Sequence, residues 1–242
     1  MSKIKRVVVK IGSALITNGG RGLDHQAITE WADQMAQLRL SGIDVVLVSS
    51  GAVAEGMTRL GLANRPKSIH ELQASAAVGQ MGLVQAYESC FQKHGIHTAQ
   101  VLLTHGEHAN RQRYLNSRST LRTLLKFGVV PVVNENDTVA TDEIRFGDND
   151  RLAARVAAMI GADVLVLLSD VDGLYTANPN GDNSATHIGE IAQITPDIMA
   201  MAGPANAAYA SGGMVTKLEA ARIATSAGCQ MIICNGQSPA PL

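Results

Sequence analysis

Residues 129–154, VVPVVNENDTVATDEIRFGDNDRLAA, place an apolar strand directly before a polar loop and the start of a helix. The valines of 129–133 predict a strand buried on both faces, and Pro131 indicates an edge strand, a bulge or a local distortion. Short polar side chains then cluster at 134–137 and again at 148–150. Ligands of open α/β sheets bind outside the carboxyl ends of the strands. The stretch therefore predicts a site for a small polar substrate.

The same order of helix, glycine, apolar strand and small polar residue occurs four times, at 42–50, 128–134, 161–169 and 228–235. Strands that alternate with helices predict right-handed crossovers and a largely parallel sheet. The polar residues that follow the strands should then lie together along one edge. The alternative is a generic α/β architecture with ordinary helix caps.

Length and composition predict one globular domain spanning residues 1–242, since no Pro/Gly/Ser-rich linker divides the chain. Lysine plus arginine (20) nearly balance aspartate plus glutamate (21), and aromatic residues make up only 3%. This composition argues against a nucleic-acid-binding surface. The arginines between 111 and 122 predict a solvated helix face or a subunit contact.

The three cysteines, Cys90, Cys229 and Cys234, form no CxxC pair. They predict reduced thiols rather than disulfides, and no cysteine-bound metal. The apolar run near the amino terminus is too short for a signal peptide, and no stretch approaches membrane-spanning length. We therefore expect a cytoplasmic protein without a membrane partner.

Two residues at strand ends have competing interpretations. Lys10 closes the apolar run 6–11, and taken alone it favours an edge-strand lysine with its ammonium group in solvent. Ser50 ends the predicted strand 44–50, and Gly51-Ala52 opens the helix that follows. Its hydroxyl could bind an anion at the helix start or simply cap the helix, and the sequence favours neither.

Helix starts are predicted at Asp24, as a cap, and at the capping-box patterns Ser68–Glu71 and Thr104–Glu107. His105 and His108 lie one helical turn apart, but no further ligand completes a metal site, so we expect surface histidines. Residues 187–192 are expected to pair as a short strand in a small flap.

Residues 211–217, SGGMVTK, predict a phosphate-binding turn, because adjacent glycines let backbone N–H groups approach phosphate oxygens at a helix start. The pattern is neither Walker A nor the dinucleotide fingerprint GxGxxG. Lys217 and Lys10 together would supply two positive charges to a transferring phosphoryl group. Asp150 would hold the two ammonium groups apart, and Ser169 and Asp170 would flank the nucleotide.

Seven motifs carry a resemblance to a known family: VKIGSALIT, VSSGAVAEG, AAVGQ, NENDTVAT, GDND, LSDVDGLYT and SGGMVTK. The chain resembles the glutamate 5-kinases of bacteria, a branch of the amino acid kinase family, from the first strand to the last. The pair NENDTVAT and GDND is the specific part, because relatives that phosphorylate acetylglutamate, aspartate, carbamate or UMP lack it. The resemblance implies a three-layer αβα sandwich around a mainly parallel open sheet.

The resemblance also implies roles for individual residues. The expected catalytic residues are Lys10, Lys217 and Asp150. The glutamate site would comprise Ser50, Asp137 and Asn149, with Asn134 and Asp148 beside them. The nucleotide site would comprise Lys10, Ser169, Asp170, Ser211, Gly212, Gly213, Met214, Val215, Thr216 and Lys217. The carboxylates of the glutamate site would receive the substrate's ammonium, while backbone N–H groups receive a carboxylate.

By the same resemblance, the chain would transfer the γ-phosphoryl group of ATP, carried with Mg²⁺, to the γ-carboxylate of L-glutamate for proline synthesis. Homo-oligomerisation, inhibition by proline and coupling to glutamyl phosphate reductase are implied as well. Ala210 and Ser211 depart from the family, which usually has glycine and threonine there. The sequence to Leu242 does not include the RNA-modification-type PUA domain that many members carry, and both a shortened chain and a compact form are consistent with this.

Three alternative functions can each be distinguished from this one by a specific feature. Another small-acid kinase of the family would differ in the acid that supports ADP release. A non-catalytic amino-acid sensor would not need Lys10, Lys217 and Asp150. An NAD-dependent enzyme is excluded, because no dinucleotide fingerprint follows the first strand.

Overall fold

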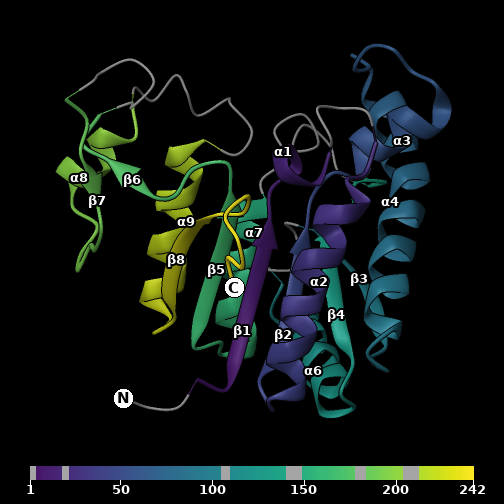
Figure 1. Cartoon of the computed structure of the whole chain (residues 1–242), viewed down its shortest axis with the longest axis horizontal. Coiled ribbons are helices and arrows are strands. Elements are labelled where there is room, and N and C mark those ends of the chain that lie inside the picture. Colours follow the sequence, from purple (N-terminus) through teal and green to yellow (C-terminus); the bar gives the residue numbers. More distant parts are fainter. Residues whose placement is uncertain (1–3, 18–21, 105–109, 140–148, 178–183, 204–212) are drawn as a thin grey trace.

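The computed structural model describes residues 4–17, 22–104, 110–139, 149–177, 184–203 and 213–242. Its centre is a six-stranded parallel sheet in the order β3-β4-β2-β1-β5-β8 (Figure 1). The strands are β1 (Arg6–Ile11), β2 (Asp44–Ser49), β3 (Thr98–Leu103), β4 (Val130–Glu135), β5 (Val164–Ser169) and β8 (Gln230–Asn235). The predicted parallel α/β fold is confirmed.

Helices cover both faces of the sheet (Figure 1). On one face, α2 (His25–Leu40) and α4 (Ile69–Gln92) pack against side chains such as Val7 and Val9 of β1. On the other face, Val8 of β1 belongs to an apolar cluster that includes residues of α6 (Arg111–Lys126), α7 (Asn149–Ile160) and α9 (Met214–Ser226). Successive strand residues point to opposite faces, so a strand buried on both sides is apolar throughout. This arrangement is the expected three-layer αβα sandwich.

The strand at the start of residues 129–154 is β4. It lies inside the sheet, between β3 and β2, so the edge-strand interpretation of Pro131 is wrong. The proline is tolerated because it precedes the part of β4 paired with β2, which begins at Val132. The strand also runs further than its apolar run, since Asn134 and Glu135 are its last two residues and both are buried. The polar cluster therefore begins within the sheet.

Two of the predicted helix starts can be compared with the structure. Asp24 caps α2, and its carboxylate accepts a hydrogen bond from the Ala27 N–H, as predicted. Ser68 stands at the start of α4, but its side chain makes no capping hydrogen bond, so that capping box is wrong. Glu107, His105 and His108 lie outside the described residues.

A short helix, α3 (Ala52–Leu60), follows β2 and crosses α4 at glycines. A Cβ atom on Gly79 would lie 1.8 Å from the Ala52 carbonyl oxygen, and one on Gly56 would lie 1.7 Å from that of Ser75. Only glycine permits such an approach. The crossing fixes α4 against the start of α3, at the carboxyl end of β2.

The remaining elements are peripheral: α1 (Ser13–Ile16), the antiparallel pair β6 (Leu174–Tyr175) and β7 (His187–Ile188), and α8 (Pro196–Met201). The β6–β7 pair confirms the predicted strand within 187–192. In the part of the chain that the structure describes, every helix is too short or too polar to span a membrane.

The glycine crossing yields a stability prediction. Gly79→Ala should lower the free energy of unfolding by about 1–3 kcal/mol or more, because the added methyl group displaces backbone rather than a mobile side chain. Urea unfolding followed by circular dichroism measures the change. Gly189→Ala is the control, since nothing lies within 4 Å of its added Cβ. Equal stability of the two variants would contradict the close crossing.

Candidate active site

The six strands are parallel, so their carboxyl ends meet at one edge of the sheet, the upper edge in Figure 1. Polar residues end four of them: Ser49 on β2, Glu135 on β4, Ser169 on β5 and Asn235 on β8. The predicted alignment of polar strand ends is confirmed. The helix that follows β1, α2, packs on one face of the sheet. The helix that precedes β8, α9, packs on the other face. Such an edge is where open α/β sheets bind ligands.

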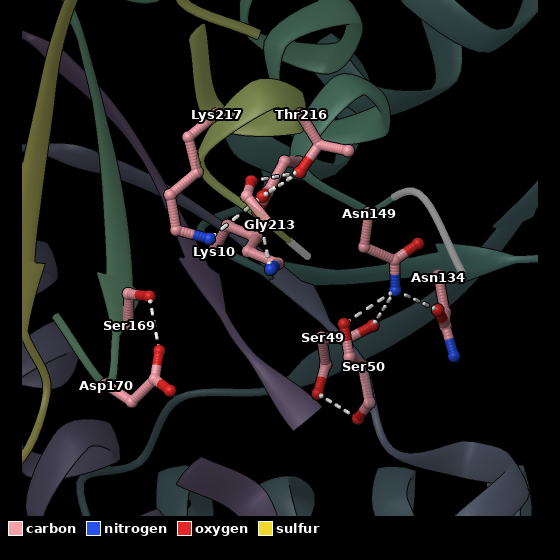
Figure 2. Close-up of polar contacts among 11 residues, drawn as sticks. Lys10, Ser49, Ser50, Asn134, Asn149, Ser169, Asp170, Gly213, Thr216 and Lys217 are labelled. Carbon is pink, nitrogen blue, oxygen red and sulfur yellow. Dashed lines mark hydrogen bonds and ion pairs between the residues drawn. The ribbon is translucent and has the colours of Figure 1, made fainter. Parts of the chain in front are cut away.

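At the middle of this edge, one carboxylate holds two ammonium groups (Figure 2). Lys10 Nζ lies 2.5 Å from Asp150 Oδ1, and Lys217 Nζ lies 3.1 Å from Asp150 Oδ2. The three side chains are at most 6% exposed. We call Lys10, Asp150 and Lys217 the lysine cluster. The interpretation of Lys10 as an edge-strand lysine is wrong, because β1 is central and the side chain is buried.

The ionisation of Asp150 depends on its two partners. Burial by itself raises the pKa of this carboxyl, but the positive charges of Lys10 and Lys217 and their hydrogen bonds outweigh burial and hold the pKa below its usual range. Asp150 is therefore an anion at neutral pH. Asp150 was expected to hold the two ammonium groups apart. In the structure it contacts both of them and keeps them at one point of the sheet edge.

The start of α9 lies beside the lysine cluster. Gly213 is its N-cap and supplies no capping side chain, so the first-turn N–H groups have no side-chain acceptor from that position. Thr216, in this turn, has its hydroxyl 3.1 Å from Asp150 Oδ2 and 2.7 Å from the Gly213 carbonyl oxygen. Met214 and Val215 form the same turn. Ser211 and Gly212 lie outside the described residues.

A second group of contacts centres on Asn149, the residue before Asp150 (Figure 2). Its Nδ2 lies 2.9 Å from three acceptors, the Ser49 carbonyl oxygen, the Ser50 hydroxyl and Asn134 Oδ1. We call Asn134, Asn149 and Ser50 the amide cluster. Ser50 is not the helix cap, because Gly51 takes that place with a φ of 97° and no side-chain cap. The structure thus brings three predicted substrate residues together.

Asp137 lies two residues beyond β4 and is partly buried. Burial raises the pKa of its carboxyl to about 6, and the positive charge of Arg65 opposes this only in part. A buried carboxylate has lost part of its hydration, so the binding of a cation to it is favourable. Asp148 lies outside the described residues.

On the other side of the lysine cluster, Ser169 ends β5 and donates a hydrogen bond to Asp170 Oδ1 at 3.0 Å (Figure 2). Ser169 is buried and Asp170 is exposed. The backbone of this strand end is tied to both neighbours, since Gly12 N–H donates to Leu168 and Gly236 N–H donates to Ser169. The pair therefore has a fixed position at the edge.

Three residues without a role predicted from the sequence lie at or next to the amide cluster: Gln80 and Ser49 contact it, and Tyr87 contacts Ser49. Gln80 Oε1 accepts from Asn134 Nδ2 at 2.7 Å, and the hydroxyls of Tyr87 and Ser49 lie 3.1 Å apart. Both α4 residues are buried, within a stripe that includes Leu72, Ala76 and Leu83. A polar residue at helical spacing within an apolar stripe is the signal that could have identified Gln80.

The described ranges contain no group of three or more His, Cys, Asp or Glu side chains arranged around a metal ion. Asp150 does not fit a direct metal ligand, because both of its oxygens face ammonium groups. Mg²⁺ in nucleotide sites is held largely by phosphates and water. The residues fit a metal that arrives with a nucleotide. The three cysteines are free thiols.

Residues 5–235 match the model of the amino acid kinase family. The chain belongs to the amino acid kinase family. It is 59% identical over 237 residues to glutamate 5-kinase of Cupriavidus taiwanensis, covering 98% of this chain and 64% of the relative. It is 60% identical over 233 residues to glutamate 5-kinase of Ralstonia pickettii, covering 96% and 62%. The chain thus spans less than two thirds of the length of these relatives.

Among solved structures, UMP kinase from Ureaplasma parvum superposes with a TM-score of 0.61. The two share 17% sequence identity, and the match covers 98% of this chain and 92% of that one. At this identity the similarity concerns the fold alone. It agrees with the parallel sheet covered on both faces described above.

Asp137 yields a prediction on the pH dependence of stability. Its pKa is about 6 in the folded protein against an ordinary value of 3.8, so the folded state binds this proton more tightly. The wild type should therefore lose stability relative to Asp137→Asn as the pH rises from 4 to 6, by roughly 2 kcal/mol after allowance for partial exposure. Urea unfolding across pH 4–8 measures the difference. Parallel stability curves would contradict the desolvated carboxylate.

Proposed function

We propose that this chain carries out the phosphorylation of the γ-carboxylate of L-glutamate by ATP, giving γ-glutamyl phosphate, the first step of proline biosynthesis. The observation that carries the proposal is the lysine cluster, in which Asp150 holds two buried ammonium groups beside the uncapped start of α9. The relatives that are about 60% identical are named glutamate 5-kinases, which supports glutamate as the acceptor.

In this proposal, the lysine cluster receives the phosphoryl group. Phosphoryl transfer depends mainly on positioning and on stabilising charge at the phosphoryl oxygens. Lys10 and Lys217 provide that charge from a buried position, where their contribution exceeds that of exposed lysines. Asp150 serves as a positioning residue, because it fixes both ammonium groups without occupying the substrate's place. Lys10 and Lys217, held in place by Asp150, form the catalytic set.

The amino-acid subsite lies on the β4 side of the lysine cluster. Asp137 receives the substrate's ammonium group, which is favourable because an opposite charge relieves its desolvation. The uncapped start of α3, at Gly51, offers N–H groups to a carboxylate. Ser50, Asn134 and Asn149 shape this subsite, and Asp148 is proposed as their neighbour.

The nucleotide subsite lies on the β5 side. Ser169 and Asp170 flank the nucleotide, and residues 211–217 approach its phosphates with backbone N–H groups and Lys217. Mg²⁺ would arrive with the nucleotide, held largely by its phosphates and water, and would offset the negative charge of the phosphates. Placing ATP and glutamate on opposite sides of the lysine cluster directs the γ-phosphate and the γ-carboxylate towards the same two lysines.

We further propose, on family resemblance, that the chain acts as a single kinase domain in a cytoplasmic homo-oligomer. Proline would inhibit by competing with glutamate, and glutamyl phosphate reductase would consume the product. A titration with proline at low glutamate tests the inhibition. No nucleic-acid or membrane partner is proposed.

The substrate is tested by ADP release with L-glutamate, acetylglutamate, aspartate and UMP as acceptors. The proposal predicts turnover with L-glutamate at least tenfold above the other three. Faster turnover with another acid would instead favour the small-acid kinase. Glutamate binding in calorimetry without ADP release would favour the amino-acid sensor.

The lysine cluster gives the mechanistic prediction. Lys217→Ala should lower kcat by roughly 10²-fold, equivalent to about 3 kcal/mol, while the KM for glutamate changes little, because the lost charge acts mainly in the transition state. Lys217→Arg should also be slow, since a planar guanidinium cannot place its charge where a compact ammonium lies. Steady-state kinetics measure both effects.

The matched control is Lys126→Ala, which removes an exposed lysine at the end of α6. Its kcat should stay within about twofold of wild type, as for most surface substitutions. Circular dichroism confirms folding of all three variants. A folded Lys217→Ala protein with near-normal kcat would remove Lys217 from the catalytic set.

A further inference from the structure

Gln80 connects α4 to the amide cluster and belongs to the AAVGQ segment, to which no role is assigned above. Its side chain is 7% exposed. Its Oε1 accepts a hydrogen bond from Asn134 Nδ2 at 2.7 Å. The glycine crossing at the preceding residue, Gly79, holds this part of α4 against the start of α3. Gln80 is thus a buried polar group with a fixed backbone position.

From Gln80, a chain of amide hydrogen bonds continues into the proposed substrate site. Asn134 Oδ1 accepts from Asn149 Nδ2 and from the Glu135 N–H, each at 2.9 Å. Asn149 Nδ2 donates to Ser50 and to the Ser49 carbonyl oxygen as well. An amide has one acceptor oxygen and one donor nitrogen, so each link determines the orientation of the next.

Two backbone groups determine the sense of this chain, the Glu135 N–H at Asn134 and the Ser49 carbonyl oxygen at Asn149. If the Asn134 amide were turned over, its nitrogen would face the Glu135 N–H and the Asn149 amide nitrogen, and its oxygen would face Gln80 Oε1. All of these contacts would then be donor to donor or acceptor to acceptor. Asn149 is consequently held with its nitrogen inward. Figure 2 shows its oxygen directed away from the three acceptors.

The other end of the Gln80 amide supplies an independent observation. Gln80 Nε2 is buried and has no acceptor among the residues that the structure describes. A buried donor without an acceptor is unfavourable, and a methionine of similar size would fill the same space without it. Packing therefore does not account for an amide here, whereas the hydrogen bond from Oε1 to Asn134 does.

We propose that Gln80 is a positioning residue of the amino-acid subsite. Through Asn134, it orients Asn149 so that the Asn149 carbonyl oxygen is presented as an acceptor. This oxygen and the Asp137 carboxylate both only accept hydrogen bonds, so together they would select a cationic donor, the ammonium group of an amino acid. The identity of that amino acid as glutamate rests on the function proposed above.

The test compares Gln80→Met with Gln80→Glu in the intact chain. Gln80→Met removes the acceptor that orients Asn134, so the KM for glutamate should rise about tenfold, while kcat and the KM for ATP stay within about twofold. Its melting temperature should change little, because the substitution removes the unpaired Gln80 donor but leaves Asn134 Nδ2 without its acceptor. Gln80→Glu keeps an oxygen for Asn134, and burial favours its neutral carboxyl, so its glutamate KM should stay within about threefold.

Gln85→Met, an exposed glutamine on the same helix, is the control and should match wild type. A glutamate KM within twofold of wild type in Gln80→Met overturns the proposal, as does an equal rise for glutamate and ATP. Failure of the proposed function is seen separately, in the wild type alone, as ADP release that does not depend on glutamate. In that case calorimetry measures the dissociation constant of the amino acid that binds, and the ratio of this constant between Gln80→Met and wild type replaces the ratio of KM values.

Discussion

The ion cluster formed by Asp150 with Lys10 and Lys217 constrains most of the site. Buried charges are tolerated in proteins only when they are paired, because removal from water costs several kcal/mol for each ion. Here the three charges come from the central strand β1, from the start of α7 and from the first turn of α9. The cluster therefore joins three elements that are distant in sequence. It also places both lysines where neither can turn into solvent without breaking one of the two ion pairs of Asp150.

The start of α7 links this cluster to the amide cluster, because Asn149 and Asp150 are consecutive residues. Asp150 turns towards the lysines, while Asn149 reaches Ser49, Ser50 and Asn134 at the ends of β2 and β4. One helix start thus sets the separation between the proposed phosphoryl and amino-acid subsites. A shift of α7 would disturb both at once, since good geometry at each depends on the same backbone.

Beneath the amide cluster, α4 provides a second layer of support. Gln80 bonds Asn134, and Tyr87 lies against the Ser49 hydroxyl. Burial raises the pKa of Tyr87, although its hydrogen bond with Ser49 opposes this, so the phenol stays neutral. The helix is held by the glycine crossing with α3 and by apolar packing on α2 and the sheet. The described part of the site therefore rests on regular elements, which hold side chains more rigidly than loops do.

Much of this arrangement was predictable from local pattern. Alternating apolar strands and helices, each joined through a glycine, indicated a parallel α/β sheet, and polar residues after the strands indicated one functional edge. The family motifs pointed to Lys10, Lys217, Asp150, Asn149 and Asn134, which the structure brings to that edge. Interpretations of single residues were weaker. Lys10 alone favoured an exposed lysine, and Ser68 a capping box. An edge strand was one of three options for Pro131, and a cap was one of two options for Ser50.

The reason lies in what each level of structure specifies. The sequence by itself determined the order and type of the elements, because hydrophobic periodicity and glycine positions act locally along the chain. Only the tertiary structure decided which strand is central, so only it could show that Lys10 is buried and paired. It alone showed that Gln80 reaches Asn134 and that Asn149 turns its nitrogen inward. Such contacts join residues far apart in the chain, and no local pattern encodes the direction of an amide or the partner of a charge.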